Sequence, residues 1–131
     1  MSMDKGRLRN PLKTARGLGS AKDGTHHSVV QRPPAVALAF LSLYVVWLVI
    51  SLIGADYATV RAKVGHPCNA VLLSAFLIAS FWHAKLGLQV VIEDYVHTPF
   101  LTVASQLAVV FVCVLAALAS VLAVIRIALG A

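Results

Sequence analysis

Three long apolar runs dominate the sequence and set what this chain can fold into. They cover residues 33–54, 67–94 and 100–127. An α-helix rises 1.5 Å per residue, so about 20 apolar residues cross the hydrocarbon core of a bilayer. The runs therefore predict an all-α membrane protein with three transmembrane helices, whose membrane anchor domain covers residues 32–131.

Composition agrees with this prediction and excludes several classes of protein. Of the 131 residues, 60% are hydrophobic and only 12% are charged. Soluble globular domains are nearer half apolar and about a quarter charged. The length leaves no room for a nucleotide-binding domain or a large catalytic domain beside the spans. Cys68 and Cys113 lie far apart without metal-ligand spacing, so both are predicted to be buried apolar side chains.

The first 31 residues form a basic, polar arm in front of the apolar body. Of the 11 basic residues, seven lie within the first 32 positions: Lys5, Arg7, Arg9, Lys13, Arg16, Lys22 and Arg32. Short basic segments stay on the cytoplasmic side during insertion, which favours a topology signal over a nucleic-acid site. The arm has no sustained apolar period, so we expect it to be loosely structured, or ordered only on a partner, up to residue 31, with a helix start at Pro33. The arm is then cytoplasmic and, after three spans, the C-terminus is periplasmic.

The second run is the informative one because it carries ionisable groups at membrane depth. His83 lies about 16 Å along the helix from Asp94 and about 24 Å from Pro67, well inside the hydrocarbon. Eleven residues at about 100° each return to within about 20° of the start, so His83 and Asp94 share one face. Gly87 lies close to that face and removes bulk beside the histidine. Each such group is a functional hypothesis.

Spacing alone leaves the roles of these groups open. A neutral His83 can ligate haem iron or bond to a neighbouring helix, and a second haem ligand would come from another chain. Asp94 and Tyr95 can serve a quinone carbonyl and a proton, or end the helix in an interfacial belt. Lys85 lies about 200° from His83 and can snorkel to headgroups or pair at an interface. Gln106, near the start of the third run, can face a polar site or bond between helices.

A resemblance to a known family narrows these alternatives. The stretch from His83 through Gly87, Gln89 and the Asp94-Tyr95 pair to His97 resembles the signature of the succinate dehydrogenase hydrophobic membrane anchor subunit, the D-type subunit of respiratory complex II. That signature has a histidine, a glycine four residues later, a glutamine six later and Asp-Tyr eleven and twelve later. The arm, from Gly17 to His27 and then Gln31-Arg32, resembles that of the alphaproteobacterial members.

The resemblance implies a role for several residues. His83 corresponds to an axial ligand of haem b, shared with a C-type (cytochrome b556-like) anchor subunit that supplies the second histidine and completes a common helical bundle. Tyr95 corresponds to the tyrosine that hydrogen-bonds ubiquinone, with Asp94 beside it near the proton path. Arg32 and His27, or less favourably His26, correspond to residues near the haem propionates.

The function implied is that of one subunit of succinate:ubiquinone oxidoreductase in the bacterial inner membrane. A flavoprotein subunit and an iron–sulfur subunit would oxidise succinate, because this chain has neither a dinucleotide fingerprint nor a cluster-type cysteine pattern. Two other hypotheses are a non-redox membrane scaffold and a small proton-coupled transporter that uses Glu93 and Asp94. The transporter hypothesis expects an internal repeat, and none is visible.

Overall fold

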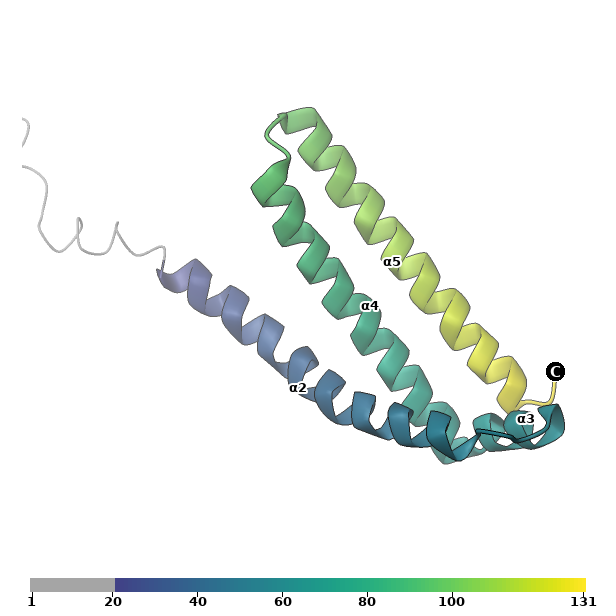
Figure 1. Ribbon diagram of the computed structural model, residues 1–131. Coiled ribbons are helices and arrows are strands. Elements are labelled where there is room, and N and C mark those ends of the chain that lie inside the picture. Colours follow the sequence, from purple (N-terminus) through teal and green to yellow (C-terminus); the bar gives the residue numbers. More distant parts are fainter. Residues whose placement is uncertain (1–20) are drawn as a thin grey trace, which may run out of the picture. The chain divides into compact units, whose positions relative to one another are not determined.

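The computed structural model describes the backbone of residues 21–131 and the side chains of residues 32–131. The described part holds four helices, α2 (Ala21–Ser51), α3 (Tyr57–Gly65), α4 (Pro67–Tyr95) and α5 (Pro99–Ala128), as Figure 1 shows. Three segments are long and apolar enough to cross a membrane, Arg32–Ser51, Pro67–Tyr95 and Pro99–Ala128. The predicted all-α membrane fold with three transmembrane helices is confirmed. The predictions for residues 1–20 lie outside the described part, as do those for the side chains of His26 and His27.

Helix α2 starts earlier than predicted. It begins at Ala21, so the expectation of loose structure up to residue 31 is wrong for its last turns, and Pro33 and Pro34 lie inside the helix. A proline removes one backbone donor and crowds the carbonyl four residues earlier. The chain divides into two compact units, residues 1–32 and 33–131, at this proline pair, and each unit is described by itself. The proline pair therefore marks the junction of the units without ending the helix.

The segment between the first two spans, which contains no long apolar run, holds a short helix. Gly54, at a φ of 77°, turns the chain after α2. The Asp56 carboxylate then accepts a hydrogen bond from the Thr59 backbone N–H at 3.1 Å and caps α3. This hydrogen bond lowers the pKa of Asp56 below its ordinary value, because it stabilises the ionised form. The missed signal was an N-cap residue ahead of a short helix of mixed composition.

Helix α3 holds together the ends of the spans that meet it. The Lys63 ammonium donates a hydrogen bond to Ser51 Oγ at 2.7 Å. The backbone carbonyl of Lys63 accepts one from Asn69 Nδ2 at 2.7 Å. The Arg61 guanidinium donates to the backbone oxygen of Ala131 at 2.6 Å. A Cβ at Gly65 would lie 3.1 Å from the carbonyl oxygen of Ile127, so glycine permits the close approach of α3 and α5. Both basic residues of α3, Arg61 and Lys63, therefore bind α3 to neighbouring segments of the chain.

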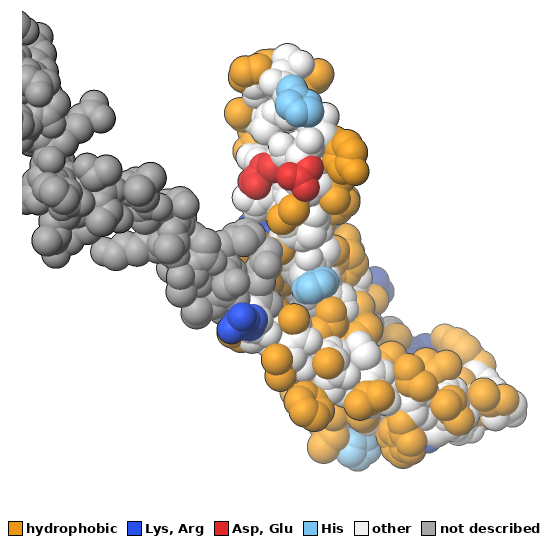
Figure 2. Space-filling view, turned by 60° about the vertical axis from the view of Figure 1, so that its left-hand side comes forward, with side chains coloured by type: hydrophobic (Ala, Val, Ile, Leu, Met, Phe, Trp, Pro, Cys, Tyr) orange, Lys and Arg blue, Asp and Glu red, His pale blue; other side chains and the backbone are white. Residues whose placement is uncertain are grey.

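Helices α4 and α5 run side by side as an antiparallel pair (Figure 1). The connection is short, and Thr102 Oγ1 donates to the Val96 carbonyl across it at 3.0 Å. Few apolar side chains in residues 32–131 are buried: Leu48, Ala70, Leu86, Cys113 and Val124. The orange apolar side chains spread over the visible surface in Figure 2 are therefore left for lipid or for other subunits.

The two cysteines have different environments. Cys113 is buried, as predicted, and packs within the α4–α5 pair. Cys68 is exposed, so the prediction of burial is wrong for this residue. The reason is helical geometry, since Cys68 lies about 200° around α4 from the buried Ala70.

Candidate functional site

His83 lies in the middle of α4 with its side chain exposed. Leu86, three residues later, is buried, whereas a Cβ added at Gly87 would meet no atom within 4 Å. Within residues 32–131, the space beside the histidine is therefore open, and α5 does not fill it. Figure 2 shows a histidine ring and the acidic side chains on one visible face of the molecule.

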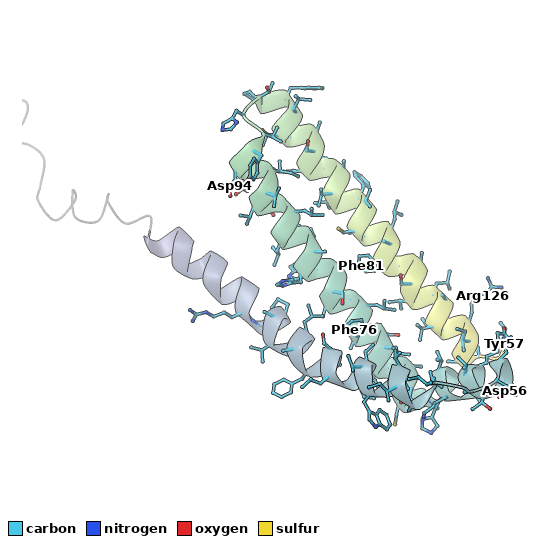
Figure 3. All side chains as sticks on the ribbon, in the orientation of Figure 1. Asp56, Tyr57, Phe76, Phe81, Asp94 and Arg126 are labelled. Carbon is cyan, nitrogen blue, oxygen red and sulfur yellow. The ribbon has the colours of Figure 1, made fainter. Side chains whose placement is uncertain are left out.

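Asp94 and Tyr95 form the end of α4, where the backbone leaves the helix at Val96. Both side chains are exposed, Tyr95 to 79%. Figure 3 shows Asp94 on the side of α4 that faces away from α5. Within residues 32–131, neither side chain has a hydrogen-bond partner. The Tyr95 phenol and the Asp94 carboxylate are therefore available to a ligand or to another chain.

The structure thus brings His83, Gly87 and Asp94 onto one side of α4, as the periodicity predicted. Arg32 is also exposed, at the start of the first span. It belongs to the unit that ends at residue 32, whereas the α4 residues belong to the unit of residues 33–131. His27 lies outside the described side chains.

A second polar cluster lies on the other side of α4, and its composition could not be read from the sequence. The amide nitrogens of Gln89 and Gln106 approach one carboxylate oxygen of Glu93, at 3.2 Å and 3.5 Å. The Lys85 ammonium sits 5.1 Å from the centre of the Trp82 ring. The sequence predicted that Lys85 faces away from His83, and Gln106 was noted as a polar group. Helical spacing relates the four residues of α4, and only the packing of α5 on α4 brings Gln106 to them.

The chemistry of the His83 side fits part of a metal-centre ligand set. Among residues 32–131, no three histidine, cysteine or carboxylate side chains gather to hold an ion. An imidazole in an open setting with a glycine beside it has the chemistry to ligate haem iron. An exposed phenol and carboxylate at the helix end fit a small carbonyl compound that accepts hydrogen bonds and protons.

Comparison with known proteins gives consistent matches. The family described as succinate dehydrogenase/fumarate reductase transmembrane subunit matches residues 6–122. The chain is 34% identical over 121 residues to the succinate dehydrogenase hydrophobic membrane anchor subunit of Paracoccus denitrificans, covering 92% of this chain and 93% of that one. It is 36% identical over 89 residues to the subunit of the same name from Rickettsia bellii, covering 68% and 71% of the two chains. No solved structure matches the chain.

Proposed function

This chain belongs to the succinate dehydrogenase/fumarate reductase transmembrane subunit family, and from that premise we propose that it holds haem b and ubiquinone together with a partner anchor subunit. Its coarser role follows from the family and the fold: it is a multi-pass membrane anchor subunit of succinate dehydrogenase that works in a complex with other subunits. The finer proposal rests on one observation. The open side of α4 carries His83, Gly87 and Asp94 together.

His83 would supply one axial nitrogen to the haem iron, and the C-type anchor subunit would supply the other. Gly87 keeps the backbone bare one turn away, which lets a flat ring lie against the helix. Arg32 and His27 would meet the haem propionates, since a guanidinium pairs well with a carboxylate where water is scarce. When bound, haem b supplies a one-electron redox centre, and the chain supplies ligand, orientation and electrostatics.

Tyr95 would donate a hydrogen bond from its phenol to a carbonyl of ubiquinone. Asp94 would hold or pass a proton beside it. Because Tyr95 is 79% exposed in this chain, other subunits must close the site around the quinone. Electrons from succinate oxidation in the flavoprotein and iron–sulfur subunits would reach ubiquinone at this end of α4.

In the proposed orientation, the three spans cross the inner membrane of a bacterium and the basic arm lies in its cytoplasm. If the three candidate spans alternate in direction, the start of the first span and the end of α4 would reach the same membrane side. Tyr95 and Asp94 would then face the cytoplasm. The soluble subunits would bind on that side, and the protons for ubiquinone reduction would come from it.

The experiment is a dithionite-reduced minus oxidised spectrum of the purified complex. His83→Ala should remove the b-type haem bands, whereas His97→Ala, a matched change at an exposed histidine on the α4–α5 connection, should leave them. Succinate oxidation with a soluble acceptor checks that the complex has assembled. Unchanged haem bands in the His83→Ala complex would refute the ligand assignment and favour the scaffold hypothesis.

A further inference from the structure

Helices α4 and α5 enclose a groove on the side of α4 that the proposed haem and quinone sites do not use. Its outer part is a cavity of about 270 Å³ whose polar lining is Lys85, Gln89 and Gln106. Its inner part is an apolar cavity of about 230 Å³ that includes Phe81. Lys85 and Val110 line both parts, so the two cavities are adjacent. Figure 3 shows Phe81 between the two helices.

The charge of Lys85 has no partner of opposite sign within residues 32–131. Its ammonium lies against the Trp82 ring, and the Glu93 carboxylate, eight residues further along α4, accepts from the two glutamines. A lysine at membrane depth is expensive unless it pairs or reaches the interface. The face of the Trp82 ring attracts the ammonium more weakly than an anion in the same place would. The groove therefore offers a cation and two carboxamides to an incoming anion.

The depth of Lys85 fits the level of a lipid phosphate. Helix α4 has 29 residues and is about 43 Å long, against a hydrocarbon core of about 30 Å, so about 7 Å projects at each end of a centred helix. The Lys85 backbone lies about 15 Å from Tyr95, which is about 8 Å below the hydrocarbon boundary. In this chain the ammonium lies against the Trp82 ring, one turn deeper, and a lysine side chain of about 6 Å that turns towards the end of α4 reaches close to that boundary. Phe81 lies about 6 Å deeper, at the level of acyl chains.

We propose that this groove binds one anionic phospholipid. The lipid phosphate pairs with Lys85 and accepts hydrogen bonds from the second amide hydrogens of Gln89 and Gln106. One acyl chain lies in the inner cavity, along Phe81 and Val110. A neutral ligand, such as a second quinone, would leave the ammonium uncompensated, so the charge favours an anion. Basic pockets between transmembrane helices are known sites for anionic headgroups.

The test measures the binding of phosphatidylglycerol to the delipidated, assembled complex by native mass spectrometry. Lys85→Gln should weaken one phosphatidylglycerol site about tenfold, the loss expected for a charge-assisted contact, whereas Lys85→Arg should retain it. Val110→Phe fills the junction of the two cavities without a change of charge and should weaken the same site. Arg126→Gln, a cation at the opposite end of α5, is the matched control and should not change it.

Three results would overturn the proposal. One is equal phosphatidylglycerol affinity in the wild-type, Lys85→Gln and Val110→Phe complexes. Another is full competition by zwitterionic phosphatidylcholine, which would make the site a general lipid contact. The third is a zero-length cross-link between Lys85 and a carboxylate of another subunit, which would place a partner chain in the groove. If the Lys85→Gln complex does not assemble, phosphatidylglycerol binding by the Val110→Phe and Lys85→Arg complexes tests the proposal.

Discussion

The space beside His83 gives the sharpest prediction. A side chain placed there should be neutral or stabilising for the isolated chain, whereas it should weaken haem retention in the assembled complex. A Cβ at Gly87 meets nothing within 4 Å, so this chain by itself should tolerate a side chain there. In a helix interior, alanine is favoured over glycine by roughly 0.5–1 kcal/mol. Within the chain alone, Gly87→Ala should therefore be neutral or stabilising.

The complex should respond differently if a haem ring occupies that space. Gly87→Leu adds four carbons about 6 Å along the helix from His83, on nearly the same face. Overpacking of this kind costs about 1–3 kcal/mol, which corresponds to roughly 5-fold to 150-fold weaker retention of the ligand. We expect Gly87→Leu to lose most of its haem and Gly87→Ala to lose less.

The assay is haem content per complex, from reduced spectra normalised to succinate oxidation with a soluble acceptor. Ala119→Leu adds similar bulk at an exposed small residue of α5 and serves as the control, with full haem content expected. A Gly87→Leu complex with normal haem content and an unchanged spectrum would refute the reasoning, because the open space would then have no occupant.

Three further outcomes are expected. Tyr95→Phe should impair ubiquinone reduction while sparing succinate oxidation by a soluble acceptor, and Tyr57→Phe, an equally exposed tyrosine outside the proposed site, should impair neither. Leu86→Ala should destabilise the assembled complex by about 2–4 kcal/mol in thermal unfolding, because Leu86 is 6% exposed, and Leu88→Ala, at 46%, should cost less than about 1 kcal/mol. The ionised Asp56 cap of α3 contributes its full stability above the ordinary carboxyl pKa, and this contribution is lost as pH falls through the lowered pKa of Asp56. Asp56→Asn should therefore remove this part of the acid sensitivity from melting temperatures measured as a function of pH.

Much of the candidate site was predictable because it lies on one continuous helix. Helical periodicity relates His83, Gly87 and Asp94 without any knowledge of other elements. The same periodicity separated Lys85 from them, but it did not predict that Lys85 lies on the α5 side, where the structure places it. The start of α2 and the α3 helix were missed, because they depend on backbone hydrogen bonds and a local cap in segments with weak apolar patterning.

The sequence by itself determined the spans, since about 20 apolar residues in lipid have few alternatives to a helix. It also determined which residues share a face of α4. Only the tertiary structure decided which face meets α5 and which stays open. The α4–α5 packing buries Leu86 and Cys113, gathers Lys85 with Gln106 and leaves His83 exposed. That choice depends on side-chain fit between two helices, which apolar periodicity does not encode when nearly every face of a span is apolar.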